Sequence, residues 1–121
     1  LPTRIEVVKR RSAFEDDPAG FSVLWAKEEA RLRKRIISAR ARLDATTVPD
    51  EAVETAARLC IALGTDGLRG ELTLVRAARA LAALEAAPRV GDTHLRRMAT
   101  SALRHRLRRN PLDEAGSTVR V

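Results

Sequence analysis

The sequence predicts an all-α fold, and three observations support this prediction. Aromatic residues are only 2% of the 121 residues, whereas hydrophobic residues are 45%. A core without aromatic residues is built from Leu, Ile, Val and Ala, and Ala and Leu are strong helix formers. Apolar residues also recur at steps of three, four and seven residues, between segments that contain Pro, Gly or Asp. We therefore expect a helical bundle without strands.

The first two helices are predicted on either side of an aspartate–proline pair. Residues 4–16 are charge-dense and have a weak apolar face. Asp17 and Pro18 then predict a helix start, because an acidic N-cap and a proline at the first helical position are both favoured. The second helix is expected to turn one apolar stripe inward, and this stripe contains Phe21, Trp25, Leu32, Ile36, Ala39 and Leu43.

The third helix follows a linker at 46–49 that ends in proline. Asp50 is expected to cap this helix, and Gly64 is expected to end it as the C′ residue. Its side chains that are expected to face the core are Val53, Ala56, Ala57, Cys60 and Leu63.

Two more helices are predicted, over residues 68–86 and from Asp92 or Thr93 to a stop at Pro111. Residues 1–111 are expected to form one helical domain, and residues 112–121 an irregular tail. The side chains of these two helices that are expected to be inward are Leu72, Val75, Ala78, Leu81, Ala82, Leu84, Leu95, Met98, Ala99, Ala102, Leu103 and Leu107.

Several function classes lack the residues that they need. The chain has no GxxxxGK[ST] phosphate loop, no apolar run long enough to span a membrane, and a single cysteine, Cys60. We expect Cys60 to be a buried structural thiol, and we expect no metal site, because His94 and His105 do not have ligand spacing. The chain begins at Leu1 without a signal-peptide pattern, so we expect a fragment of a longer cytoplasmic protein.

The net charge of +7 comes mainly from arginine, since Lys occurs only at positions 9, 27 and 34 among the 23 basic residues. Arginine binds carboxylates and phosphates in a bidentate manner, although codon usage explains such a bias equally well. The densest basic stretch has no interleaved aromatic residue for base stacking, so an acidic protein partner or a solvated face is favoured over nucleic acid. This stretch contains Arg96, Arg97, Arg104, His105, Arg106, Arg108 and Arg109.

The segment around Arg69 is the most informative. Gly64, Gly67 and Gly70 lie within seven residues at a predicted helix start, where glycine lowers helix stability. Arg69 lies in the first turn, where a cation opposes the helix dipole. One interpretation is that Arg69 reaches an anion such as a nucleotide phosphate, and the other is a glycine-rich turn with an exposed arginine. Arg76 lies on the same predicted stripe and is a second candidate, with a surface salt bridge as its alternative.

These residues carry a family resemblance. The string GTDGLRGELTL at 64–74, followed by RAARA at 76–80, resembles the helical lid of magnesium chelatase AAA+ ATPase (I) subunits. EVVKRR at 6–11, Phe14, Trp25 and HRLRRNPLDEAGS at 105–117 are also similar to that family.

The resemblance implies the C-terminal lid of an ATPase whose α/β module binds ATP and Mg²⁺. It implies a ring of subunits that works with D and H subunits to insert Mg²⁺ into protoporphyrin IX during chlorophyll or bacteriochlorophyll synthesis. Arg69 matches the second-sensor arginine of the family, which contacts nucleotide. A D subunit, the lid of a related AAA+ ATPase, a basic nucleic-acid-binding module and a structural helix bundle are the alternatives.

We predict that this chain alone does not hydrolyse ATP, because it has no phosphate loop. A phosphate-release assay on the purified chain checks this expectation, and turnover that survives repeated purification would contradict it.

Overall fold

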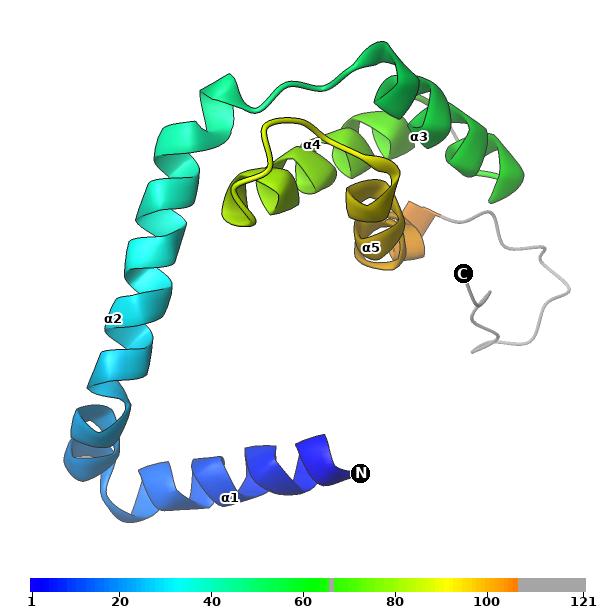
Figure 1. The fold of residues 1–121 in the computed structure, drawn as a ribbon. Helices are drawn as coiled ribbons and strands as arrows, with labels where there is room; N and C mark the ends of the chain where they lie inside the picture. The colour runs from blue at the N-terminus through cyan, green and yellow to red at the C-terminus, as the bar shows by residue number, and fades with distance from the viewer. Residues whose placement is uncertain (66, 107–121) are drawn as a thin grey trace, which may run out of the picture. The chain divides into compact units, whose positions relative to one another are not determined.

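The computed structural model describes residues 1–65 and 67–106, and in these ranges it is helical (Figure 1). No strand lies in these ranges, and a parallel bridge joins Thr47 to Arg89, so the all-α prediction is confirmed. The helices are α1 (Pro2–Asp16), α2 (Pro18–Arg42), α3 (Asp50–Ala62), α4 (Arg69–Leu84) and α5 (Asp92–Leu103), with 3₁₀ turns at Leu43–Ala45 and Arg104–Arg106.

The chain divides into two compact units, residues 1–37 and residues 38–121, and the division falls inside α2. In the first unit, the Gly20 N–H donates to Asp17 Oδ1 at 3.1 Å, which confirms the predicted cap of α2. The rings of Phe14, Phe21 and Trp25 contact one another in sequence, with centroid distances of 5.7 and 6.0 Å. These aromatic contacts join α1 to the start of α2.

Two residues in the middle of the predicted apolar stripe of α2 are not inward. Leu32 is 54% exposed and Ile36 is 44% exposed, so the sequence prediction is wrong for both. Ala39 is the one buried residue of α2, and Leu43, just beyond it, is half-buried. Helical periodicity identifies which face is apolar, but it does not show whether another element covers that face.

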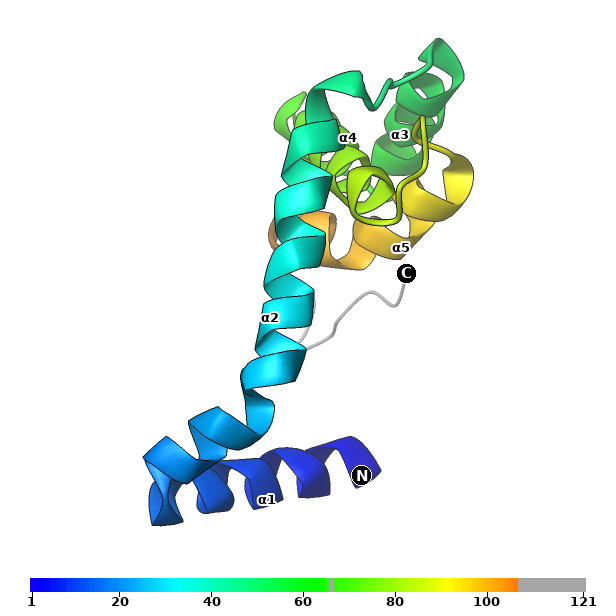
Figure 2. The same cartoon turned by 60° about the vertical axis from the view of Figure 1, so that its left-hand side comes forward.

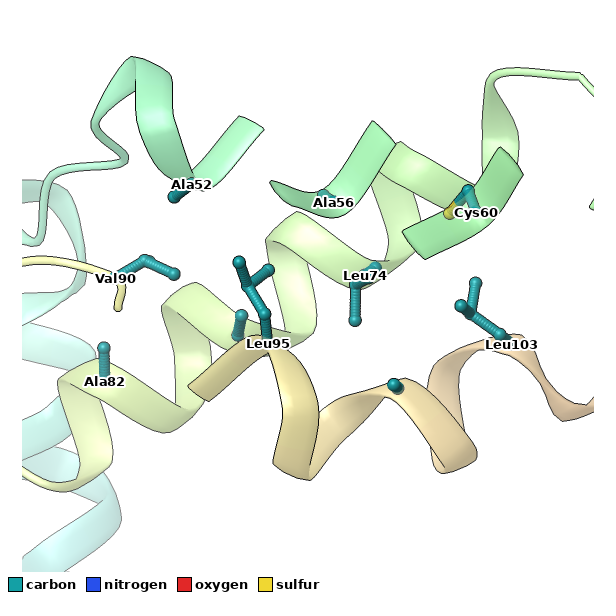
Figure 3. Close-up of a cluster of buried hydrophobic side chains, with 10 residues drawn as sticks. Ala52, Ala56, Cys60, Leu74, Ala82, Val90, Leu95 and Leu103 are labelled. Carbon is teal, nitrogen blue, oxygen red and sulfur yellow. The ribbon is translucent and has the colours of Figure 1, made fainter. Parts of the chain in front are cut away.

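In the second unit, α4 packs on both α3 and α5 (Figure 2). Figure 3 shows the side chains that meet between these helices. Small side chains dominate the buried stripes of α3 and α4, which lets neighbouring helices approach closely. The core cluster contains Ala52, Ala56, Cys60, Leu74, Ala78, Ala82, Val90, Leu95, Ala99 and Leu103.

Some details of this core differ from the sequence prediction. Val53 and Leu72 were expected inside, but they are 47% and 52% exposed. The buried stripes instead pass through Ala52 on α3 and Leu74 on α4, each one or two residues away. Asp50 is the first residue of α3 and makes no side-chain cap bond, since the N-cap is Pro49. Leu107, Pro111 and the tail at 112–121 lie outside the described residues.

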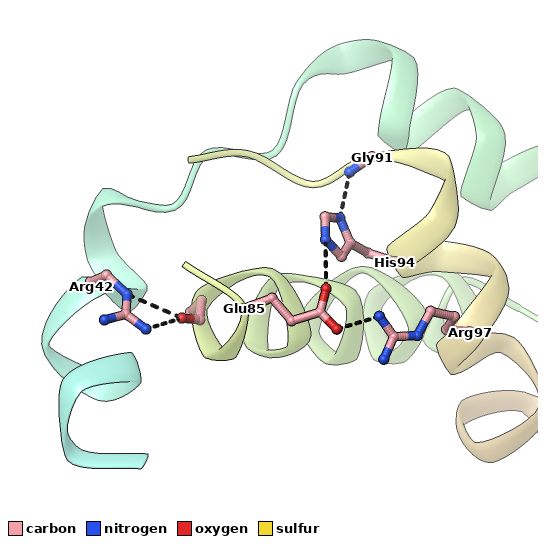
Figure 4. A network of polar contacts seen from close by, with 6 residues as sticks. Arg42, Glu85, Gly91, His94 and Arg97 are labelled. Carbon is pink, nitrogen blue, oxygen red and sulfur yellow. Dashed lines mark hydrogen bonds and ion pairs between the residues drawn. The ribbon is translucent and has the colours of Figure 1, made fainter. Parts of the chain in front are cut away.

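Two arginines join the C-terminal half of α4 to the last residue of α2 and to the segment after it. The Arg42 guanidinium donates to the Ala83 carbonyl from Nε at 3.2 Å and from Nη2 at 2.7 Å (Figure 4). Arg79 Nε donates to the Thr46 carbonyl at 2.9 Å. The Arg42 cation is favourable at the end of α4, because the helix dipole is negative there.

The end of α4 carries one strained residue. Ala86 has φ +56°, the left-handed conformation that favours glycine. It is held by a helix-terminating pattern in which the Ala87 N–H donates to the Ala82 carbonyl at 2.8 Å and the Ala86 N–H donates to the Ala83 carbonyl at 3.2 Å.

We predict that Ala86→Gly raises the free energy of unfolding by about 1 kcal/mol. Glycine removes the energetic cost that alanine has in the left-handed conformation, and the greater conformational freedom of glycine in the unfolded chain offsets only part of this gain. Urea denaturation of both proteins measures the difference. Ala80→Gly is a suitable control, because Ala80 is an exposed position inside α4, where glycine is expected to destabilise. A destabilising Ala86→Gly would contradict the assigned turn.

Candidate functional site at the start of α4

The turn between α3 and α4 begins with a glycine-terminated helix. Gly64 has φ +66°, and its N–H donates to the Ile61 carbonyl at 3.1 Å. The Thr65 N–H donates to the Cys60 carbonyl at 3.1 Å, which completes the Schellman pattern of a helix C-terminus. The prediction that Gly64 ends this helix is therefore confirmed.

The other two glycines also have structural explanations. Gly67 has φ +67°, in the left-handed region. Gly70 is buried, and a Cβ there would lie 3.1 Å from Thr65 Oγ1 and 3.5 Å from Cys60 Sγ. The side chains that closely approach Gly70 thus belong to the end of α3 and the turn after it. The glycines by themselves therefore give no evidence of a ligand, and Arg69 must be judged on its own surroundings.

Arg69 is the first residue of α4, and it is exposed. The N-cap residue, Leu68, makes no side-chain cap bond. Within the described part of the chain, Arg69 forms no ion pair and no side-chain hydrogen bond. An exposed cation at the positive end of a helix, without an acidic partner among the residues that the structure describes, is available to a negatively charged group from elsewhere.

Arg76 is exposed on α4, seven residues after Arg69, and Thr73 between them is half-buried. Helical geometry puts the two arginines on one side of α4 but about 10 Å apart along its axis. The structure therefore places both predicted site residues on an accessible helix surface, but it does not bring them to one point.

Cys60 lies buried beneath this turn. Burial raises the pKa of its thiol above the ordinary value, the hydrogen bond with Thr65 opposes this rise, and the Glu71 charge adds to it. Thr65 Oγ1 in turn donates to the Cys60 carbonyl at 3.2 Å. The thiol is thus kept in its neutral form, as the expected structural role requires.

A polar network that the sequence did not suggest orders the other end of the unit. Nδ1 of the buried His94 accepts a hydrogen bond from the Gly91 N–H at 2.9 Å, which caps the start of α5 (Figure 4). Glu85 pairs with Arg97, and its other oxygen lies 3.6 Å from His94 Nε2. The signal in the sequence for this network is a histidine three residues after the glycine N-cap. The role of His94 here is structural.

Two searches of the described residues complete the survey. No group of three or more His, Cys, Asp and Glu side chains among them could hold a metal ion. None of the helices in the described ranges combines the length and the apolar character that crossing a membrane requires.

The part of the chain that contains the candidate site matches a known protein family. The model of the AAA lid domain matches residues 53–121, which is more than half of the chain. The chain belongs to the AAA lid domain family. The match covers most of α3 and all of α4 and α5, and it includes Arg69, Arg76 and the glycine-rich turn.

Relatives of this lid domain extend the similarity to the whole chain. The chain is 57% identical over all 121 residues to the magnesium-chelatase 38 kDa subunit of Rhodobacter capsulatus, and it covers 35% of that protein. It is 42% identical over 118 residues to the subunit of the same name from Chlorobaculum tepidum, covering 30% of it. It is also 38% identical over 116 residues to an uncharacterized Mycobacterium tuberculosis protein, covering 18% of it. The chain thus spans about a third or less of the length of these relatives.

We predict that Cys60 in the folded lid domain reacts slowly with a disulfide reagent at mildly alkaline pH, and rapidly after unfolding in guanidinium chloride, because burial favours the neutral thiol. Because folding raises the pKa of the Cys60 thiol, the free energy of unfolding also depends on pH. The contribution of Cys60 is complete below the ordinary pKa of 9.0 and declines as pH rises through the folded pKa. Stability measured against pH for wild type and Cys60→Ala tests this. Equal reaction rates in the folded and unfolded chains would contradict the assignment.

Proposed function

We propose that this chain is the C-terminal helical lid of the AAA+ ATPase (I) subunit of a magnesium chelatase. The observation that carries the proposal is the 57% identity to the 38 kDa subunit from Rhodobacter capsulatus, which extends over the entire chain, including α1 and α2 outside the family match. In this role the lid helps to couple ATP hydrolysis to the insertion of Mg²⁺ into protoporphyrin IX during bacteriochlorophyll or chlorophyll synthesis.

Arg69 is proposed as the residue that contacts the nucleotide. The support is its exposed position at the start of α4 and its lack of an acidic partner among the described residues. A guanidinium in such a position can bind phosphate oxygens in a bidentate manner and respond to their charge. Arg76 is proposed as a second interface residue. It lies too far along α4 from Arg69 to contact the same group.

The remaining parts of the activity are assigned to other modules and subunits. ATP and Mg²⁺ are proposed to be bound mainly by an α/β module, which supplies the phosphate loop that this chain lacks. The proposed partners are this module, other copies of the subunit in a ring, and the D and H subunits, in the cytoplasm. The lid of a D subunit or of another AAA+ ATPase is the second candidate, and the similarity to the mycobacterial protein favours keeping it.

We predict that Arg69→Ala in the full-length protein lowers ATP turnover by about 10²–10³, because one positioned cation is lost from a phosphoryl-transfer site. The fold should change little, since an exposed side chain usually contributes within about 0.5 kcal/mol. ATP turnover and thermal melting are measured on the same preparation.

Arg40→Ala is the matched control, because Arg40 is also an exposed helical arginine and makes no ion pair with the described residues. It should retain near-normal turnover. If Arg69→Ala folds normally and also hydrolyses ATP at the wild-type rate, Arg69 is a turn residue and the proposed contact is wrong. Arg76→Ala is expected to weaken subunit assembly more than it lowers the affinity for nucleotide.

A further inference from the structure

Residues at the ends of α2 and α4 form a closed ring of hydrogen bonds. The half-buried Arg42 guanidinium donates twice to the Ala83 carbonyl, at 3.2 and 2.7 Å (Figure 4). Arg79, four residues before Ala83 on α4, donates to the Thr46 carbonyl at 2.9 Å. The hydroxyl and the N–H of Thr46 donate to the Arg42 carbonyl at 3.0 and 3.1 Å, which returns the ring to α2. We refer to Arg42, Thr46, Arg79 and Ala83 as the arginine clasp.

The need to pair a buried carbonyl does not explain the clasp. The Ala83 carbonyl also accepts a hydrogen bond from the Ala86 N–H at 3.2 Å, so it would keep a partner without Arg42. Neither Arg42 nor Arg79 pairs with a carboxylate among the residues that the structure describes. The guanidiniums add directionality, because a planar group that donates from two nitrogens to one carbonyl restricts the angle between two segments as well as their distance.

The clasp also connects parts of the chain that the covalent path keeps apart. The AAA lid domain match begins at residue 53, so two clasp residues lie inside the matched region and two precede it. Along the chain, the linker at 46–49 leads from α2 to α3 rather than to α4. Backbone hydrogen bonds extend the connection, since the Thr47 N–H donates to the Pro88 carbonyl at 3.1 Å and accepts through its own carbonyl from the Val90 N–H at 2.9 Å.

Arg69 and the clasp lie at opposite ends of one helix. α4 runs from Arg69 to Leu84, and its 16 residues span about 24 Å. A helix of this length acts as a rigid element, so a displacement of its first turn is carried to its last turn. At the last turn, the directional hydrogen bonds of the clasp pass such a displacement to the end of α2.

We propose that Arg42 and Arg79 are positioning residues that make α4 and the last turn of α2 move together, so that nucleotide contact at Arg69 changes the structure of residues 42–48. This inference rests on the proposed function, because the nucleotide contact supplies the signal. It goes further than that function, because it assigns the residues that carry the signal out of the matched lid domain.

Hydrogen–deuterium exchange of the full-length protein tests the inference at two places. Exchange is measured with and without Mg²⁺ and a non-hydrolysable ATP analogue, in peptides that cover residues 67–74 and residues 42–48. Backbone amides exchange when their hydrogen bonds open locally, so slower exchange indicates a more stable local structure. In the wild type, the analogue should slow exchange in both peptides by at least about fivefold, the lower end of ordinary coupling between two sites.

Arg42→Met and Arg79→Met each remove a guanidinium but keep a long unbranched side chain with similar helix propensity. In both variants the response to the analogue should remain at 67–74 and fall below about twofold at 42–48. Arg40→Met is the matched control, because Arg40 is an exposed arginine two residues before Arg42 and makes no ion pair with the described residues. It should keep both responses. A purely structural clasp would instead give faster exchange at 42–48 in both conditions, with the response to the analogue unchanged.

The two peptides separate the possible failures. If the wild type shows no response at 67–74, the proposed nucleotide contact and the clasp inference both fall. If the wild type responds at 67–74 but not at 42–48, or if the clasp variants respond at 42–48 as the wild type does, the clasp inference alone is overturned. Loss of both responses in the clasp variants, but not in Arg40→Met, would show that the two arginines maintain the fold without transmitting a signal, and would also overturn it.

Discussion

The contact between Gly70 and the end of α3 determines how the lid domain is built. Because Gly70 has no side chain, the first turn of α4 lies close to Thr65, where a Cβ would be tightly packed at 3.1 Å from Oγ1, and within ordinary contact of the Cys60 sulfur, which lies 3.5 Å from the Cβ position. The turn that makes this approach possible requires left-handed conformations at Gly64 and Gly67. With Gly70 facing inward, the preceding residue, Arg69, is left on the exposed surface at the helix start. A packing requirement thereby determines the position of the candidate functional residue.

The rest of the second unit follows from the direction that this contact gives to α4. Leu74, Ala78 and Ala82 continue the buried side of the helix at steps of four residues. At the far end of the same helix, Arg42 and Arg79 bind carbonyl oxygens across the boundary between α4 and the segment after α2. A single helix therefore connects the exposed arginine to the end of α2. Under the proposed function, this connection would transmit a change at the nucleotide from Arg69 to the end of α2.

Much of this architecture could be predicted from local sequence signals. Asp17 with Pro18 and the glycine at position 64 are recognised because short-range hydrogen bonds and φ preferences determine helix ends. The exact core could not be read in the same way: alanine-rich helices have apolar residues on several sides, and tertiary packing selects Ala52 over Val53 and Leu74 over Leu72. The left-handed Ala86 and the His94 cap also depend on surrounding structure. The sequence marked Arg69 as unusual, and the structure shows that the glycines beside it serve the fold.

The central claim is that this packing presents Arg69 to a nucleotide phosphate. An experimental structure of the full-length protein with Mg²⁺ and a non-hydrolysable ATP analogue tests it most directly. The claim predicts that the Arg69 guanidinium lies within hydrogen-bonding distance of a phosphate oxygen, in its own subunit or across a subunit boundary, with Gly70 still packed on Cys60. A structure in which the phosphates are fully liganded by other residues while Arg69 faces solvent would contradict it.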